Sequence, residues 1–402
     1  MKEGKYFRIP ERPADIEQLW REAKPLDTKT LPAWLSPEDA SMYRLSGPAP
    51  AAGMLAGDPQ SCFAEVEELE LAGLIVDRDR NGNRDHMGNV YVRTLDYPDI
   101  WSIGIYAGDS PLHLTPAHGV VSPVLTRDDV TDVPAVFVAD PFMIRANDRW
   151  HIFFEVMNWR ANKGEIGLAT SEEGFKWTYQ RIVLAEEFHL SYPCVFEWMG
   201  DYYMVPESCQ AGAIRLYKAE AFPTRWSCVG NLLVGPYLVD PSTFRYRDKW
   251  WMFAETNPEV RHDTLRLYYA NDLTGPWREH PQSPIVRSNA RGARPGGRVL
   301  ADADRIIRFA QDCSSFYGAA VRAFEITELT EANYSEQEVG LDPILGASGK
   351  GWNARGMHHI DAHQLNDKSW LACVDGWLSI GKDDEPFLGA TQGLSKTLRQ
   401  NA

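Results

Sequence analysis

Alternating apolar and polar positions recur along the chain in units that each predict a β-hairpin. Each unit holds an alternating run, a polar turn with Asp, Asn or Gly, and an aromatic-rich run, which is typical of two antiparallel strands joined by a tight turn. The copies span residues 139–155, 191–207, 239–255, 294–311 and 360–375. Because the same segment recurs at intervals of roughly fifty residues, the sequence predicts a repeat architecture.

A second pattern of two further strands, joined by a loop, follows each of the first four hairpins. These pairs span residues 164–184, 212–235, 263–286 and 318–339. A hairpin and such a pair make four strands, which is one blade of a β-propeller. The fifth hairpin has little sequence after it, but residues 100–125 carry the missing pattern. We therefore predict an all-β fold, a five-bladed β-propeller over residues 98–382 whose ring is closed by upstream strands. A β-sandwich is the alternative, but it would not require five hairpins in register.

Residues 1–97 lack the hairpin repeat. Residues 16–24 and 61–76 show the apolar spacing of helices, and a loop rich in Pro, Ala and Gly lies between them at residues 47–53. The sequence predicts a small, mainly helical N-terminal extension, and residues 383–402 are expected to form a C-terminal tail.

Composition narrows the class of protein. The 402 residues include 56 acidic and 41 basic side chains, and the net charge of −15 disfavours nucleic acid or an anionic membrane as the main partner. No apolar run approaches the roughly 20 residues of a membrane span, and the N-terminus has no signal-peptide core, so we expect a cytoplasmic protein. Six cysteines without a Cys-x-x-Cys pair indicate free thiols. The 14 tryptophans suit either sheet packing or stacking on sugar rings.

Charged residues stand at equivalent positions of the hairpin copies. The first strand of a blade lines the propeller axis, so its starting residues should converge at one mouth of a central funnel. A hairpin of two strands of about six residues brings the chain back to the same end. The first three copies supply Asp140, Tyr192 and Asp240 at the strand starts and Glu155, Glu207 and Glu255 at the hairpin ends.

The last two copies add basic residues and one more acid to this predicted funnel, namely Arg294, Arg298, His359, Asp361 and His363. Like charges that converge in one pocket are costly unless function or a bound cation requires them. The arginines suit an acidic sugar or a phosphate, and the histidines suit sugar hydroxyls or a metal. The alternative is that the acids only cap turns and strand ends, and it weighs most for Glu155 and Glu255.

A separate acidic loop has the oxygen spacing of a calcium site. Residues Asp77, Asp79, Asn81 and Asp85 stand at positions 1, 3, 5 and 9 of such a loop. Position 12 is Gly88, so the usual bidentate carboxylate is missing. A polar, turn-rich loop without metal is the alternative.

Six segments carry a resemblance to known proteins: FVADPFM (137–143), SYPCVFEWMGDYYMVPES (191–208), VDPSTFRYRDKWWMF (239–253), DLTGPWREHPQSPIV (272–286), RPGGRV (294–299) and HHIDAHQL (358–365). Over residues 100–376 the chain resembles the five-bladed propeller glycoside hydrolases of the family 43 and family 32 clan. The resemblance is strongest to the family 43-like propeller at the N-terminus of plant glucosamine inositolphosphorylceramide transferases and their bacterial relatives.

The resemblance implies a glycoside hydrolase that cleaves a furanoside or related glycan, with inversion and without a required cofactor. It implies Asp140 as general base and Asp240 as the second aspartate, which tunes the acid and orients the sugar. The fourth-blade segment RPGGRV carries no carboxylate where the family places its general acid, so Glu207 is the best substitute. One carboxyl must stay protonated while the other activates water.

Two other functions stay open for this predicted funnel. Some proteins of this group bind glycans without cleaving them, so a non-catalytic glycan-binding propeller, or an accessory module of a glycosyl-transferring system, is the alternative. A protein-interaction scaffold would not explain the converging carboxylates. In each glycan case the expected partner is a carbohydrate or glycoconjugate.

Overall fold

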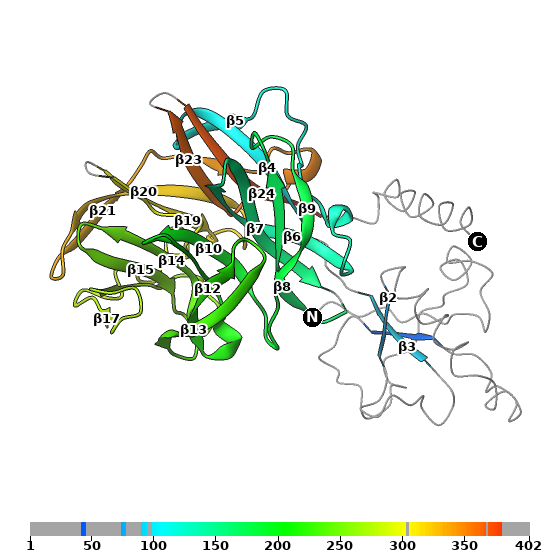
Figure 1. The fold of residues 1–402 in the computed structure, drawn as a ribbon, viewed down its shortest axis with the longest axis horizontal. Coiled ribbons are helices and arrows are strands. Elements are labelled where there is room, and N and C mark those ends of the chain that lie inside the picture. Colours follow the sequence, from blue (N-terminus) through cyan, green and yellow to red (C-terminus); the bar gives the residue numbers. More distant parts are fainter. Residues whose placement is uncertain are drawn as a thin grey trace, which may run out of the picture. The chain divides into compact units, whose positions relative to one another are not determined.

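The computed structural model describes residues 99–379 except 159, 303–304 and 367–368, together with the backbone of 42–45, 74–77 and 90–94. Contacts divide the chain into two units, Pro98–Gly381 and Met1–Tyr97 with Lys382–Ala402. The first unit is the propeller (Figure 1). Within the described residues, no helix is long and apolar enough to cross a membrane.

Five antiparallel sheets form the blades, and each sheet is ordered from the axis outward. Blade 1 holds β6 (Ala135–Ala146), β7 (Arg149–Asn158), β8 (Lys163–Ser171) and β9 (Thr178–Leu184). Blade 2 holds β10 (Ser191–Trp198), β11 (Asp201–Glu207), β12 (Ala213–Ala221) and β13 (Arg225–Val234). Blade 3 holds β14 (Val239–Tyr246), β15 (Lys249–Glu255), β16 (Leu265–Ala270) and β17 (Arg278–Glu279).

Blade 4 holds β18 (Leu300–Ala301), β19 (Ile306–Asp312), β20 (Ala320–Leu329) and β21 (Tyr334–Glu338), with β22 (Leu345–Gly346) also paired to β20. Blade 5 holds β23 (Ile360–Asn366), β24 (Ser369–Ser379), β4 (Asp99–Ser110) and β5 (His113–Pro116). Short 3₁₀ turns connect some strands: η3 (Arg127–Asp129), η4 (Cys209–Ala211) and η5 (Gly351–Asn353).

The predicted ring closure is confirmed. Strand β4 pairs antiparallel with β24 along its length, from Asp99 opposite Ser379 to Gly108 opposite Trp370. Figure 1 shows the cyan β4 beside the orange-red β24, although they lie far apart in sequence. The upstream strands thereby complete blade 5 and cover the outer edge of β24.

Among the described residues, each junction between neighbouring blades holds a large apolar cluster. A smaller cluster of Trp101, Ala139 and Trp377 lies between blades 5 and 1. Successive residues of a strand face opposite sides of the sheet, so Leu371 and Ala372 of β24 belong to clusters on different sides of blade 5. Paired members across the five junctions include Phe153 and Met204, Ile214 and Met252, Phe253 and Ile326, Phe309 and Ala372, and Leu371 and Ile152. Burial on both faces explains the nearly continuous apolar runs of the second strands.

The N-terminal unit differs from prediction where it is described. Three strands, β1 (Met42–Leu45), β2 (Leu74–Asp77) and β3 (Val90–Thr94), form a sheet in the order β1-β3-β2. The end of the segment 61–76, predicted as helical, is therefore strand β2. Its residues Leu74–Val76 are a continuous apolar run with a β-branched pair, which suits a strand as well as a helix. The other predicted helix, residues 16–24, lies outside the described residues.

Candidate functional site

A β-bulge recurs at the start of three inner strands and sets the direction of the first site residues. Asp140, Tyr192 and Asp240 have φ angles of 52°, 46° and 49°, a left-handed conformation that few residues other than glycine adopt. Each precedes a proline, and the strand pairing skips two residues at each of these points. The repeat thus imposes the same strained backbone three times, which is a feature of functional sites.

The ends of the second strands form a ring of five polar side chains at the same end of the propeller. Glu155, Glu207 and Glu255 pair with the residue before the bulge on their own inner strand. Gln311 and Asp375 complete the ring, because they end the hairpins of blades 4 and 5. All five are buried. Sequence reasoning missed Gln311 and Asp375, although they end the fourth and fifth hairpin copies.

Asp140 presents an unpaired oxygen to the funnel. Its side chain is buried, and Oδ1 has no hydrogen-bond partner within the described residues. The nearest ring nitrogens, His358 Nε2 and His359 Nδ1, each lie 3.8 Å from that oxygen. Burial raises the pKa of Asp140 to about 7; the charges of Asp240 and Asp375 add to the rise, and His358 opposes it. A carboxyl with this pKa exchanges its proton near neutral pH, as a general base must.

Glu207 is suited to hold a proton. Its Oε1 accepts the backbone N–H of Cys209 at 2.8 Å. Burial raises the pKa of Glu207 to about 8, and the charges of Asp240 and Asp140 add to that rise. Glu207 is therefore mostly protonated at the pH at which Asp140 begins to ionise.

The two neighbouring glutamates also have raised pKa values. Burial raises the pKa of Glu255 to about 7, although its Oε1 accepts the Asn257 backbone N–H at 2.8 Å. Burial and the surrounding carboxylates raise the pKa of Glu155 well above its usual range. His189 Nε2 lies 3.4 Å from Glu155 Oε1, and the Gly164 N–H donates to His189 Nδ1. The proton of neutral His189 is therefore on Nε2 and faces Glu155.

Asp240 is held by two donors on one oxygen and is open on the other. Its Oδ2 accepts Arg294 Nε at 2.7 Å and Gln311 Nε2 at 2.8 Å. The Gln311 amide nitrogen also donates to the Pro295 carbonyl, so its oxygen must point the other way. Four buried oxygens at this mouth consequently lack a partner: Asp140 Oδ1, Asp240 Oδ1, Glu255 Oε2 and Gln311 Oε1. Such a set calls for hydrogen-bond donors, which ordered water or a ligand can supply.

Tyr192 starts the inner strand of blade 2, but its hydroxyl is already hydrogen-bonded within the protein and is not available to a ligand. Its hydroxyl lies 2.7 Å from Ser242 Oγ, donates to the Gly297 carbonyl and accepts the Gly297 N–H. A Cβ at Gly297, whose φ is +142°, would lie 1.7 Å from the Ile360 carbonyl oxygen. This crossing of blades 4 and 5 explains why the RPGGRV segment has glycine here. Tyr192 supports the axis, whereas the sequence suggested that it binds substrate.

Two of the predicted basic residues and one acid lie away from the carboxyl mouth. Arg298 is paired with Asp361, with Nε and Oδ1 2.6 Å apart, and Asp361 Oδ2 accepts the Met143 N–H. Attraction to Arg298 overcomes the effect of burial and holds the pKa of Asp361 below its usual range. His363 bonds to the same carboxylate from its other side. Of the two arginines, Arg294 joins the funnel through Asp240, whereas Arg298 is held by Asp361. Asp361 and His363 lie on β23, beyond the residues at the mouth.

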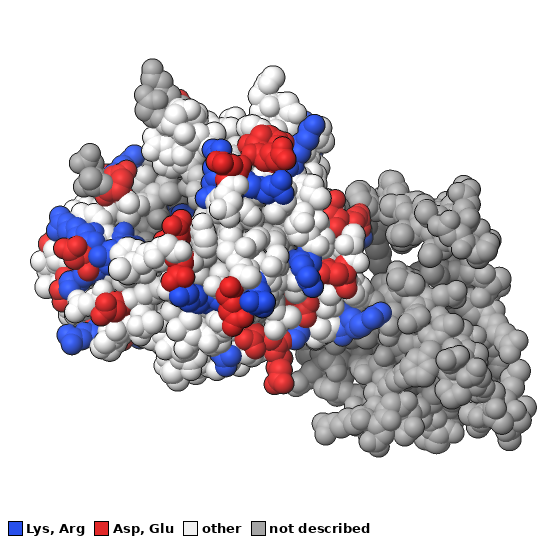
Figure 2. Space-filling view, in the orientation of Figure 1, with Lys and Arg blue, Asp and Glu red and all other residues white. Residues whose placement is uncertain are grey.

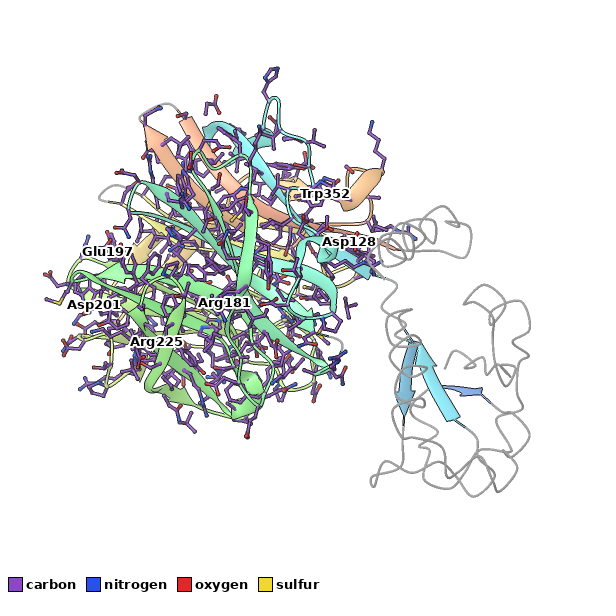
Figure 3. All side chains as sticks on the ribbon, turned by 45° about the vertical axis from the view of Figure 1, so that its right-hand side comes forward. Asp128, Arg181, Glu197, Asp201, Arg225 and Trp352 are labelled. Carbon is purple, nitrogen blue, oxygen red and sulfur yellow. The ribbon has the colours of Figure 1, made fainter. Side chains whose placement is uncertain are left out.

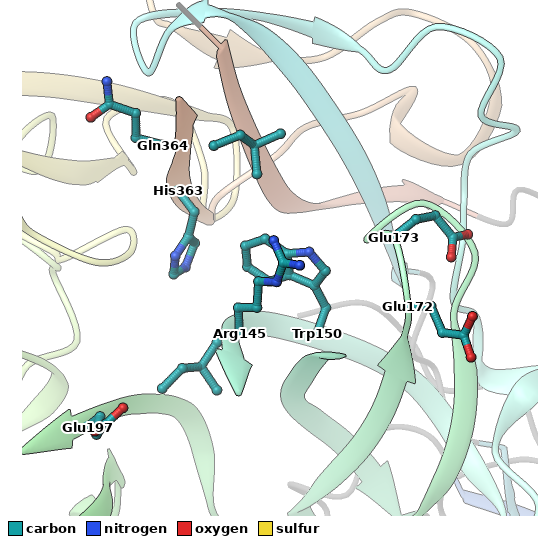
Figure 4. Close-up of a pocket in the computed structure, with 9 residues that line it drawn as sticks. Arg145, Trp150, Glu172, Glu173, Glu197, His363 and Gln364 are labelled. Carbon is teal, nitrogen blue, oxygen red and sulfur yellow. The ribbon is translucent and has the colours of Figure 1, made fainter. Parts of the chain in front are cut away.

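His363 instead lines a cavity at the turn end of the hairpins, with a volume of about 540 Å³ (Figure 4). Figure 3 shows Glu197 and Asp201 at the turn of hairpin β10–β11, the end opposite Glu207. The cavity is lined by Ile144, Arg145, Trp150, Glu172, Glu173, Glu197, His363, Gln364 and Leu365.

Acidic and basic side chains are interspersed over the propeller face shown in Figure 2.

Three rim residues were missed by the sequence reasoning because they come from loops outside the hairpin repeat. Tyr317 is 41% exposed and its ring lies 4.9 Å from the Arg294 guanidinium carbon. His262 Nδ1 is 3.0 Å from Arg294 Nη1. Burial lowers the pKa of both His262 and His189 to about 4, so both rings are neutral at pH 7. The rim thus offers an aromatic face and neutral imidazoles to a ligand.

His359 lies beside Asp140 and is fully buried, and neither ring nitrogen has a hydrogen-bond partner among the described residues. Burial lowers its pKa to about 4, so the ring is neutral at pH 7. Among the described residues, one group could share a metal ion: Asp140, His358 and Asp375 offer ligand atoms within 4.8 Å of one another. The predicted calcium loop lies outside the described residues, apart from the backbone of Asp77 at the end of β2.

The fold and the site define a five-bladed β-propeller in which buried carboxyls gather at one mouth. A family described as "Glucosamine inositolphosphorylceramide transferase 1, N-terminal" matches residues 94–377. The chain belongs to this family.

The curated relatives are plant proteins named glucosamine inositolphosphorylceramide transferase 1. That of Oryza sativa subsp. japonica is 38% identical over 296 residues, covering 69% of this chain and 40% of the relative. That of Arabidopsis thaliana is 33% identical over 316 residues, covering 73% of this chain and 41% of the relative. The chain therefore spans about two fifths of the length of the relatives it matches.

Solved structures with partial similarity are glycoside hydrolases. A family 117 enzyme of Zobellia galactanivorans is 18% identical with a TM-score of 0.41, over 62% of this chain and 87% of that one. The Cellvibrio cellulosa α-L-arabinanase with arabinohexaose is 14% identical with a TM-score of 0.44, over 59% and 90%. The RS223 β-xylosidase is 13% identical with a TM-score of 0.47, over 60% and 85%.

Proposed function

We propose that the funnel hydrolyses a glycosidic bond with inversion, and that Asp140 is the general base and Glu207 the general acid. The observation that carries the proposal is the pairing of two unlike carboxyls at one mouth. Asp140 has an unpaired oxygen and a pKa of about 7, and Glu207 has the higher pKa, about 8. Carboxyls with raised pKa values, one with an open oxygen and the other held by a backbone N–H, suit the roles of base and acid.

Each group then has a defined step. Asp140 takes a proton from water as the water oxygen bonds to the anomeric carbon. Glu207 gives its proton to the leaving oxygen as the glycosidic bond breaks. Asp140 ends protonated and Glu207 ionised, and exchange with solvent restores both. Asp240 is paired with Arg294 through one oxygen, so its other oxygen is available to accept a sugar hydroxyl.

Alternative acids are weaker candidates. Asp361 is ionised and both of its oxygens are engaged by Arg298, Met143 or His363. Glu155 has a raised pKa, but its Oε1 faces the Nε2 proton of His189. Glu207 therefore remains the best acid.

A second candidate function is glycan binding without cleavage, as an accessory module of a glycosyl-transferring system. The observation that favours it is the fourth blade, where Gln311 and the glycines stand in place of an acid. The names of the relatives and their greater length also support it, because more than half of each relative lies outside the match. The same unpaired oxygens would then hold sugar hydroxyls without a reaction.

The test is a screen of aryl glycofuranosides and glycopyranosides with the purified protein, followed by three isosteric variants. We expect Asp140→Asn and Glu207→Gln each to lower kcat/KM at least ~10²-fold. Glu255→Gln should have little effect, because it keeps the acceptor for the Asn257 N–H and has no assigned proton transfer. Glu187→Gln on the exposed surface is the matched control.

Three results would contradict the assignment or the reaction. Full activity of Glu207→Gln on a substrate with a poor leaving group would exclude it as the acid. Retention of configuration in the product would exclude inversion. Glycan binding by calorimetry without turnover, unchanged by Glu207→Gln, would establish the binding module instead.

A further inference from the structure

We propose that Tyr317 and His262 form a second sugar subsite beside the carboxyl mouth, so that the ligand of the funnel is a glycan of at least two sugar units. The inference rests on the proposed function in one respect, namely that the funnel takes a sugar. Its own evidence is an aromatic loop that is held at both ends and yet exposed at the mouth, and a histidine beside it whose free donor is fixed.

The loop of residues 313–319, which joins β19 to β20, is held at both ends by hydrogen bonds. At its start, Asp312 Oδ1 accepts the backbone N–H of Ser314 at 3.1 Å. At its other end, the buried Nε1 of Trp377 in blade 5 donates to the Gly318 carbonyl at 2.9 Å. The conformation of the loop is therefore set within the protein before any ligand binds.

The two aromatic residues between these fixed ends are exposed. Phe316 is 50% exposed and Tyr317 41%, whereas their aromatic neighbours Trp101 and Trp377 are buried. Phe316 meets Trp377 edge-on with centroids 6.0 Å apart, and Tyr317 meets Trp101 edge-on at 6.2 Å. Adjoining aromatic rings that are left exposed on a fixed loop indicate a binding surface, because a preformed surface loses little entropy when a ligand binds.

Tyr317 is joined to the funnel by Arg294. The guanidinium carbon of Arg294 lies 4.9 Å from the centroid of the Tyr317 ring, and its Nε donates to Asp240 Oδ2 at 2.7 Å. The other oxygen, Asp240 Oδ1, has no partner within the described residues. A single guanidinium group thus separates an open funnel oxygen from the aromatic surface, which suits two adjoining units of one glycan.

His262 supplies a hydrogen-bond donor at the same place. Its Nδ1 lies 3.0 Å from Arg294 Nη1, and an arginine can only donate, so Nδ1 is the acceptor. The proton of the neutral ring is therefore on Nε2, which has no hydrogen-bond partner within the described residues. The His262 and Tyr317 rings lie 5.6 Å apart between centroids. One sugar unit can consequently pack its apolar face on Tyr317 and accept the Nε2 hydrogen bond.

The chemistry of this surface favours a sugar over an acyl chain or an anion. The positive charge of Arg294 is already paired with Asp240, so it attracts an anion weakly. The Tyr317 hydroxyl, like His262 Nε2, makes no hydrogen bond within the part of the chain that is described. An acyl chain lying over the two rings would bury both polar groups unpaired, which is costly. Sugar hydroxyls would pair with both.

The test compares glycans of different length. An oligosaccharide array is probed with the purified protein, and the sugars that bind are titrated by calorimetry as ladders of one to four units. We expect the affinity to rise about five- to tenfold from one unit to two, which is the contribution of one aromatic stacking contact. Tyr317→Ala should remove this rise and leave the affinity for one unit unchanged, and Tyr317→Phe should keep most of it.

Two further measurements make the comparison specific. Tyr246→Ala, at a partly buried tyrosine at the turn end of blade 3, is the matched control and should leave the whole ladder unchanged. Imidazole ¹⁵N resonances of the unaltered protein should show His262 as the Nε2–H tautomer. They should shift when a two-unit glycan is added to protein already saturated with the single sugar.

The inference would be overturned by equal affinity for one unit and for longer glycans, or by a rise with length that persists in Tyr317→Ala. An array on which no oligosaccharide binds, or binding of phospholipid vesicles that Tyr317→Ala abolishes, would overturn it as well. Hydrolysis is decided separately. Length-dependent binding without turnover would leave the subsite and remove the reaction, whereas cleavage of aryl glycosides without any effect of length or of Tyr317 would do the reverse.

Discussion

Replacing Glu207 with Gln should stabilise the protein, and the gain should grow with pH. The glutamine keeps an oxygen for the Cys209 N–H and removes a carboxyl whose charged form is poorly tolerated in the funnel. In the unfolded chain Glu207 ionises near its ordinary pKa of 4.5, whereas in the folded protein its pKa is about 8. Folding therefore takes up a proton between these values, so the stability associated with Glu207 is complete below pH 4.5 and is lost as the pH rises to 8.

The magnitude follows from the size of the shift. One pKa unit corresponds to about 1.4 kcal/mol. A rise from 4.5 to about 8 then makes the ionisable carboxyl less favourable than a neutral group by about 1 kcal/mol at pH 5, about 3 at pH 7 and about 5 at pH 9. These are upper values, because neighbouring carboxyls readjust when one is removed. The trend with pH is the safer expectation.

The assay is equilibrium unfolding in urea at pH 5, 7 and 8.5, with both tryptophan fluorescence and circular dichroism as probes. Glu187→Gln, the same change at an exposed position, should alter stability by no more than about 0.5 kcal/mol at each pH. A gain for Glu207→Gln that is equal at pH 5 and pH 8.5, or a loss at pH 8.5, would refute the protonated, buried acid. The variant should also be inactive, so that stability and activity change in opposite directions.

Three further expectations concern other parts of the chain. The kcat/KM of a cleaved substrate should follow a bell-shaped pH profile with limbs near 7 and 8, from Asp140 and Glu207, and a profile flat from pH 6 to 9 would contradict these roles. Asp361→Asn should lower the free energy of unfolding by about 3–5 kcal/mol, because it leaves Arg298 buried and unpaired, and a loss below 1 kcal/mol in urea would exclude this. If the acidic loop at residues 77–85 binds calcium, chelator should lower the Tm and millimolar calcium should restore it; no shift would exclude the site.

Much of the fold could be predicted because the same hairpin pattern recurs in every blade. The alternation of apolar residues, the turn residues and the upstream pair at 100–125 are local signals, and β4 pairs with β24 as they require. The strand at Leu74–Val76 was mistaken for part of a helix, since a short apolar run without a clear period suits both.

The carboxyl mouth could be predicted in part for the same reason. Residues at equal repeat positions must converge, which holds for Asp140 and Glu207. Side-chain direction is a tertiary property, and the position of a residue in the repeat does not reveal which partner it meets. Arg298 and Asp361 were thus assigned to the mouth, although they neutralise each other within the axis. Asp375 was overlooked because its role depends on a bond to another blade.

That inter-blade bond links closure of the ring to the chemistry of the mouth. Strand β24 is paired on one edge with β23 and on the other with β4, so the upstream segment holds the strand that carries Asp375. Asp375 in turn accepts the amide of Asp140 at the start of the chain's first complete blade. Closing the propeller therefore brings the two ends of the ring together and at the same time places the proposed base. A blade built from both ends of the propeller sequence makes the site dependent on complete folding, because Asp140 and Asp375, which accepts its backbone N–H, belong to different blades.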